Sequence, residues 1–289
     1  MVFPRWRAHD RPAAARCLLG VVLVLSLAGC GVGHIQTLRE AEEAFSRAAE
    51  RENRERLNPN APLASLAESA AGYRVAAQMV NDLVATQREE LRRDNLLCTA
   101  HLVRAMSLWR LGEHDAAVQV AAQGRDCAPP APTSDATPRD RAVLYAIPAL
   151  VRIDQANALV VNQTASEAEF DTARSEIDRA VRILEEAQRM ASRDHPVRGY
   201  LMTSKLAAFR VWQVAITRER LVDPKRREQL AAFNEQARHA WLDYRYFVTC
   251  QLDRATDPTV EEWRKLFQLA APETSVSCDR PPLNQGPPS

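Results

Sequence analysis

Glycine is scarce in this sequence, and clustered runs of alternating β-branched residues are missing. Only 9 of the 289 residues are glycine, whereas alanine, leucine, glutamate and arginine are abundant. A sheet protein carries β-branched and aromatic residues clustered in strands, so this composition argues against one. The abundant residues are the strong helix formers. The sequence therefore predicts an all-α fold.

Neither sign of charge is in excess. The chain has 38 lysine and arginine residues against 37 aspartate and glutamate residues, a formal net charge of +1. Proteins that bind nucleic acid concentrate positive charge on one face, because they must neutralise phosphates. The balanced charge gives no electrostatic case for such binding, and we expect no nucleic-acid partner.

The motifs that mark common enzyme and metal sites are also absent. The sequence has no GxSxG, no glycine-rich phosphate loop, no HExxH and no histidine or cysteine cluster with metal-ligand spacing. His101 and His114 are interpreted as structural. Glu185 and Glu186 are helix neighbours that point about 100° apart, so we interpret them as solvated. We expect no catalytic residue, no metal and no cofactor.

A positive leader and a short apolar run open the chain. Residues 1–16 carry four arginines and one acidic residue, and the next twelve residues, 17–28, have no charge. A membrane-spanning helix needs about 20 apolar residues, so this run is too short to span. A charged leader before a short apolar core is typical of a signal peptide. The alternative is a buried core helix.

The apolar run ends in Leu-Ala-Gly-Cys at residues 27–30, which resembles the lipobox of bacterial lipoproteins. The resemblance implies that residues 1–29 are removed and that Cys30 carries diacylglycerol and an N-acyl chain such as palmitate. In this family an aspartate after the cysteine retains the protein at the inner membrane, and this chain has Gly31 there. The resemblance thus implies an outer-membrane protein that faces the periplasm. Two or three acyl chains hold a protein far more firmly than one.

Four cysteines remain after the leader is removed and Cys30 is assigned to lipid. They are Cys98, Cys127, Cys250 and Cys278. An exported chain with an even number of spare cysteines favours disulfides over free thiols. Four cysteines allow three pairings, and counting alone leaves the choice open.

Apolar residues recur at three- and four-residue spacing along most of the chain, which indicates amphipathic helices. Capping residues and prolines mark several helix starts, at Thr137-Pro138, Asp223-Pro224, Asp257-Pro258 and Ser166 with Glu169. We expect Pro148 to kink or split its helix. The predicted helices span residues 36–57, 63–93, 96–111, 114–126, 139–161, 167–193, 197–221, 225–252 and 258–270.

Residues 99–129 resemble a tetratricopeptide repeat, a hairpin of two helices. Ala105 and Ala117 stand at the small positions where the two helices cross, Leu111-Gly112 at the turn, and Pro129 at the end. Glycine permits the sharp reversal. The resemblance implies antiparallel helical hairpins that stack as a repeat solenoid. An irregular helical bundle with one such hairpin is the alternative.

The repeat register also favours one disulfide pairing. Cys98 begins the first helix of the hairpin and Cys127 lies near the end of the second, so the two ends are adjacent in an antiparallel pair. We therefore expect Cys98–Cys127, which leaves Cys250–Cys278 to staple the last helix to the one before it. Each bridge stabilises the fold by about 3 to 4 kcal/mol in the chain-entropy model.

In tetratricopeptide repeats, ligand peptides lie along the face made by the first helix of each hairpin. Carried over by position, this row is Thr99, Leu102, Met106 and Trp109. Trp109 is the strongest candidate, because large aromatic residues anchor interfaces. The alternative is that Trp109 packs against a neighbouring helix.

These features predict a signal peptide over residues 1–29, an α-helical domain over 30–272 and a proline-rich tail over 273–289. We expect a lipid-anchored scaffold or accessory lipoprotein that binds other envelope proteins and is not an enzyme. The alternative is a ligand-binding helical lipoprotein of the kind that accompanies TRAP-type transporters. That alternative requires an enclosed apolar pocket.

Overall fold

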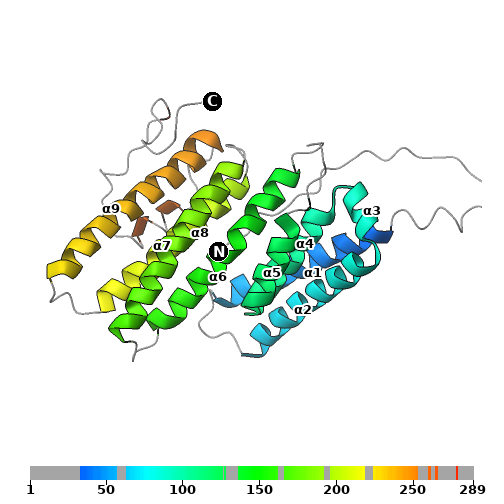
Figure 1. The fold of residues 1–289 in the computed structure, drawn as a ribbon, viewed down its shortest axis with the longest axis horizontal. Coiled ribbons are helices and arrows are strands. Elements are labelled where there is room, and N and C mark those ends of the chain that lie inside the picture. The colour runs from blue at the N-terminus through cyan, green and yellow to red at the C-terminus, as the bar shows by residue number, and fades with distance from the viewer. Residues whose placement is uncertain are drawn as a thin grey trace, which may run out of the picture. The chain divides into compact units, whose positions relative to one another are not determined.

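In the computed structural model, every described element of regular structure is a helix (Figure 1). The all-α fold predicted from composition is confirmed for these residues. The predicted signal peptide, Cys30 and the tail apart from Cys278 lie outside the described part of the chain. The described residues are 33–56, 63–125, 127, 136–161, 166–191, 196–218, 224–252, 260–261, 264–265 and 278.

The chain divides into two compact units, residues 1–137 and 138–289, where the sequence predicts one helical domain. The helices of the first unit are α1 (Gly33–Arg56), α2 (Leu63–Thr86), α3 (Arg88–Arg93), α4 (Leu97–Arg110) and α5 (His114–Arg125). Those of the second are α6 (Ala136–Val161), α7 (Glu167–Met190), α8 (Pro196–Arg218), α9 (Pro224–Tyr246) and the π-helix η2 (Phe247–Gln251).

Local sequence signals mark the starts of three helices, α7, α8 and α9. At the start of α7, the backbone N–H of Glu169 donates to the Ser166 hydroxyl, and the backbone N–H of Ser166 donates to the Glu169 carboxylate. This is the predicted capping box. Helices α8 and α9 begin at Pro196 and Pro224, where a missing backbone N–H costs nothing. Of the predicted helix 258–270, only residues 260–261 and 264–265 are described, and they are helical.

The structure departs from the predicted helices in several ways. The predicted helix 63–93 breaks at Gln87 into α2 and α3. Helix α6 begins at Ala136, before Pro138, because the first turn of a helix needs no backbone donor. Pro148 does not split α6. Its neighbours Ile147 and Ala149 are fully buried, so packing offsets the lost hydrogen bond.

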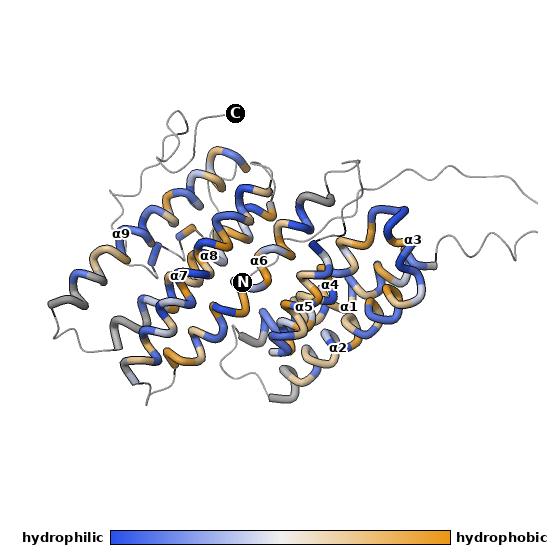
Figure 2. The backbone as a smooth tube through the Cα atoms, in the orientation of Figure 1, coloured by the Kyte–Doolittle hydropathy of each residue, from blue (hydrophilic) through white to orange (hydrophobic). Residues whose placement is uncertain are grey.

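The first unit is built around the close contact of α1 with α2, with α4 packed on α2 and α5 on α4. A Cβ at Gly72 would lie only 2.9 Å from the Cβ of Ala48, so glycine permits this approach. The rings of Phe45 and Tyr73 pack beside it with centroids 5.4 Å apart. Figure 2 shows hydrophobic and hydrophilic segments alternating along these helices, as expected of amphipathic helices that bury one face.

In the second unit, α8 packs on α7 and α9 packs on α8. The core between them is aromatic: Phe209 and Phe233 meet edge to face at 5.5 Å, and Trp241 and Phe247 are fully buried. A Cβ at Gly199 would lie 2.8 Å from the Phe247 ring. Trp241 and Phe247 therefore belong to the hydrophobic core of the second unit.

Helix α6 contains a long apolar segment. Its segment Arg139–Val161 meets the length and hydropathy criteria for a membrane span, and it is the one described helix that does so. However, 56% of that window is buried inside the protein. A core helix meets the same criteria, so α6 gives little support for a membrane crossing.

Candidate functional site

The predicted hairpin is present as α4 and α5, joined by a turn at residues 111–113. Gly112 has a φ of 77°, which glycine adopts without strain. The backbone N–H of Glu113 donates to the carbonyl of Leu108 over 2.9 Å, which closes the first helix. Ala105 and Ala117, predicted to lie where the helices cross, are both completely buried.

Two disulfides hold the described chain, and they are the two pairs that the sequence favours. Cys98 and Cys127 are bonded with Cα atoms 5.2 Å apart, and both residues are buried. Cys250 and Cys278 are bonded with Cα atoms 5.4 Å apart, and Cys278 is exposed. The first bridge therefore belongs to the core of its unit, whereas the second is open to solvent.

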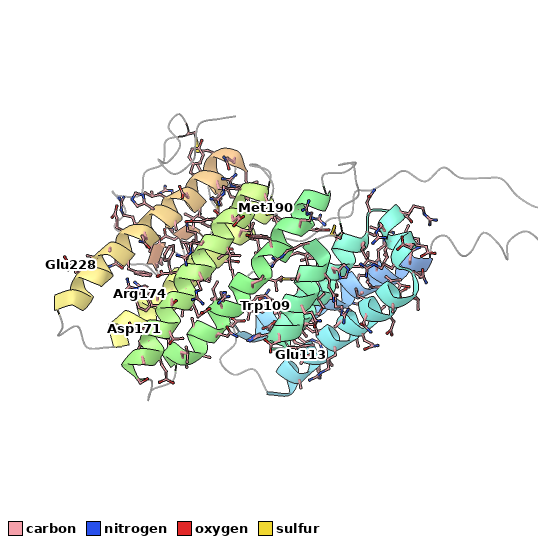
Figure 3. All side chains as sticks on the ribbon, in the orientation of Figure 1. Trp109, Glu113, Asp171, Arg174, Met190 and Glu228 are labelled. Carbon is pink, nitrogen blue, oxygen red and sulfur yellow. A yellow bond between two sulfur atoms is a disulfide. The ribbon has the colours of Figure 1, made fainter. Side chains whose placement is uncertain are left out.

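The predicted partner-binding row on α4 is largely buried. Thr99, Met106 and Trp109 are 9%, 4% and 7% exposed, and Leu102 is half-buried. Figure 3 labels Trp109 within the first unit. The burial favours the packing alternative, because α4 contacts α1, α2, α3 and α5 and its side chains fill those contacts. The binding role of the row from Thr99 to Trp109 stays a prediction, and the low exposure of these side chains does not support it.

A buried carboxylate joins three helices of the first unit. The hydroxyl of Tyr73 in α2 donates to Oε2 of Glu52 in α1 over 2.6 Å. Arg110 at the end of α4 donates to Oε1 of Glu52 over 3.5 Å, and the two side chains are only 7% and 10% exposed. The guanidinium of Arg110 also lies 4.5 Å from the centroid of the Trp109 ring. The sequence pattern alone does not predict this group.

A second polar contact fixes the beginning of α1. His34 is completely buried, and its Nε2 donates to Oδ2 of Asp94 over 2.6 Å. The hydrogen bond from His34, followed by that from Arg93, lowers the pKa of Asp94 below its ordinary value. The carboxylate is therefore ionised at neutral pH and accepts a hydrogen bond from the imidazole N–H.

The loop that presents Asp94 is set by a left-handed residue. Asn95 has a φ of 58°, a conformation that asparagine tolerates better than most residues. The backbone N–H of Leu96 then donates to the carbonyl of Leu91 over 2.8 Å, which closes α3. Leu91 itself is fully buried and holds α3 against the unit.

His101 is a buried histidine without hydrogen bonds. It is 1% exposed, and neither ring nitrogen has a partner. Burial, followed by the positive charges of Arg88 and Arg104, lowers the pKa of His101 to about 4. The imidazole is therefore neutral at pH 7, as suits the structural role expected from the sequence.

The second unit holds a comparable polar group between α7, α8 and α9. Lys205 donates to Glu185 over 2.5 Å. Glu185 is paired, but its side chain is still 42% exposed and Glu186 is exposed, in agreement with the predicted solvated face. Nearby, Oδ1 of Asp243 is buried without a hydrogen-bond partner, and burial raises the pKa of Asp243. The positive charges of Lys205, His239 and Arg198 oppose that rise.

None of these groups forms a metal site. Within the described ranges, no three side chains of histidine, cysteine, aspartate or glutamate come close enough together to hold an ion. No family model, curated protein or solved structure matches this chain. The fold and the polar contacts define an all-α protein of two disulfide-bonded helical units, and its function is inferred from its own residues.

Proposed function

We propose that this protein is a lipid-anchored scaffold of the bacterial cell envelope, attached to the outer membrane through Cys30 and binding other envelope proteins. The observation that carries the proposal is the position of the lipobox. The tetrapeptide that ends at Cys30 lies directly before a folded unit, since α1 begins at Gly33. A signal segment followed this closely by a folded domain suits a protein that is held at a membrane surface.

The disulfides support an exported protein. Each unit contains one bridge, Cys98–Cys127 in the first and Cys250–Cys278 in the second. Disulfides persist in the periplasm and are rare in the reducing cytosol. Two bridges in a chain with a lipobox therefore favour the periplasmic side of the envelope.

The proposed partners are proteins, as the resemblance of residues 99–129 to a tetratricopeptide repeat implies. We assign no enzymatic step, since the sequence carries no catalytic motif. The polar groups that the structure does bring together also have structural explanations. Glu52, Tyr73 and Arg110 join α1, α2 and α4, and the Lys205–Glu185 pair joins α8 to α7.

The test is quantitative crosslinking in native envelopes with the full-length protein as bait. Two variants serve as controls. Cys30→Ala, exported behind an ordinary secretory leader, lacks the lipid, and Gly31→Asp keeps the lipid but is directed to the inner membrane by the lipoprotein sorting rule. We expect a stoichiometric protein partner with the wild type and a strong loss with both variants. Equal capture by all three proteins, or no protein partner at all, contradicts the proposal.

A further inference from the structure

The beginning of α1 is locked into the fold. Helix α1 starts at Gly33, and the next side chain, His34, is completely buried and bonded to Asp94. The bond spans 60 positions of sequence and ties the first turn of α1 to the end of α3. The body of the first unit therefore begins, as a rigid structure, at residue 33.

This start lies very close to the proposed lipid site, so the inference rests on the proposed function. His34 lies four positions after Cys30. A chain of four residues reaches at most about 14 Å, whatever its conformation. A diacylglyceryl group holds its cysteine at the level of the lipid headgroups. The backbone of His34 must then lie within about 14 Å of that level.

Helix α3 shares this end of the unit, as Figure 1 shows, where the dark-blue start of α1 lies beside α3. We call Gly33, His34 and residues 86–95 the anchor end. The turn between α4 and α5 lies at the opposite end, because α4 starts just after the anchor end and runs for 14 residues. At 1.5 Å per residue, α4 places Glu113 about 21 Å from Leu97.

The surface of the anchor end carries charges of both signs. Arg88, Arg92 and Arg93 are exposed, and Arg92 pairs with Glu89 over 2.8 Å. Arg93 pairs with Asp94 over 3.3 Å. The large exposed hydrophobic residues of the described chain are Val75, Val161 and Met190, and none belongs to the anchor end. This surface therefore suits contact with polar headgroups and has no side chain to insert into hydrocarbon.

We propose that the anchor end rests on phospholipid headgroups, with the α3 arginines beside lipid phosphates, and that the α4–α5 turn faces away from the membrane. Zwitterionic headgroups carry a phosphate and an ammonium group, which match the arginines and acids of α3. The His34–Asp94 bond holds the first turn of α1 against α3, so the lipid at Cys30 keeps α3 close to the headgroups. Without it, the first turn of α1 becomes a longer tether.

The experiment uses the full-length lipoprotein in vesicles of phosphatidylethanolamine and phosphatidylglycerol. The photoreactive residue p-benzoylphenylalanine replaces either Glu89, at the anchor end, or Glu113, in the α4–α5 turn. Both side chains are exposed, so they form a matched pair. We expect several-fold more lipid crosslinking from position 89 than from position 113. Equal crosslinking, or more from position 113, overturns the inference.

Two further measurements distinguish a failure of the proposed lipid attachment from a failure of the proposed orientation. The intact mass and the vesicle-bound fraction report lipid attachment, and their failure contradicts the proposed function itself. Asp94→Asn in the position-89 protein weakens the bond to His34. We expect it to keep the vesicle-bound fraction and the helical circular dichroism while position-89 crosslinking falls several-fold. Unchanged crosslinking in that variant contradicts the role of the His34–Asp94 bond.

Discussion

Tyr73 donates a hydrogen bond to the carboxylate of Glu52 over 2.6 Å, and the two residues lie on neighbouring helices 21 positions apart. Glu52 is 8% exposed and also accepts from Arg110. A buried carboxylate is costly unless its oxygens are satisfied, and here both have donors. The group therefore fixes α1, α2 and α4 in one arrangement.

Removing the tyrosine hydroxyl should destabilise the first unit. Tyr73→Phe keeps the ring contact with Phe45 and deletes one hydrogen bond to a charged group, which lowers the free energy of unfolding by about 1.5 to 3 kcal/mol. Glu52→Gln and the double variant complete a double-mutant cycle measured by urea unfolding. Additive effects in that cycle would show that the bond contributes nothing of its own.

His101 should make stability depend on pH. The unfolded imidazole has a pKa of 6.5 and the folded one about 4, so between these values only the unfolded chain binds the proton. The stability that depends on a neutral His101 is fully present above about pH 6.5 and is lost as the pH falls to about 4. At about 1.4 kcal/mol per unit of pKa, the loss is about 3 kcal/mol.

The matched variant for this prediction is His101→Leu. The leucine has a similar size and removes two ring nitrogens that have no partners, so it should cost little stability at pH 7. Urea unfolding at pH 7, 5.5 and 4 should show a shallower pH dependence in the variant. Identical pH dependence in both proteins would show that His101 is not the source of the loss of stability at low pH.

Trp109→Ala tests packing against partner binding. Because Trp109 is 7% exposed, its removal should lower the free energy of unfolding by about 3 to 5 kcal/mol. Val75→Ala is the control, since Val75 is 51% exposed and should change stability by less than about 0.5 kcal/mol. A small stability loss in Trp109→Ala together with weaker partner capture would instead support the role of Trp109 in partner binding.

The two disulfides should differ in their reaction with thiols. Cys98 and Cys127 are buried, whereas Cys278 is exposed. Under native conditions a thiol reductant should therefore open Cys250–Cys278 first, as measured by alkylation and peptide mapping. Opening Cys98–Cys127 should require unfolding of the first unit. Simultaneous loss of both bridges at a single rate contradicts the observed difference in burial.

Much of the fold could be predicted from the sequence because local signals set it. Helix bounds follow from apolar spacing, the Ser166 capping box and prolines at first turns, and these act within a few residues. The pairing of Cys98 with Cys127 was predicted from the hairpin register for the same reason. The break at Gln87 lacks a proline or glycine signal, and it was missed.

The polar groups could not be predicted, because they depend on which helices meet. Glu52 lies in a run of charged residues that is typical of a solvated helix face, and its partners are 21 and 58 positions away. His34 and Asp94 are 60 positions apart. The predicted row from Thr99 to Trp109 is largely buried for a related reason. A repeat register places residues on a face, but the packing of other helices on α4 decides which faces stay exposed.

The decisive measurement is mass spectrometry of the N-terminal peptide of the protein purified from its own envelope. If Cys30 is the lipid site, this peptide begins at Cys30 and carries diacylglyceryl and N-acyl groups, and the protein fractionates with the outer membrane. A peptide with unmodified Cys30, or a mature chain that begins elsewhere, would contradict both the scaffold proposal and the membrane-facing anchor end.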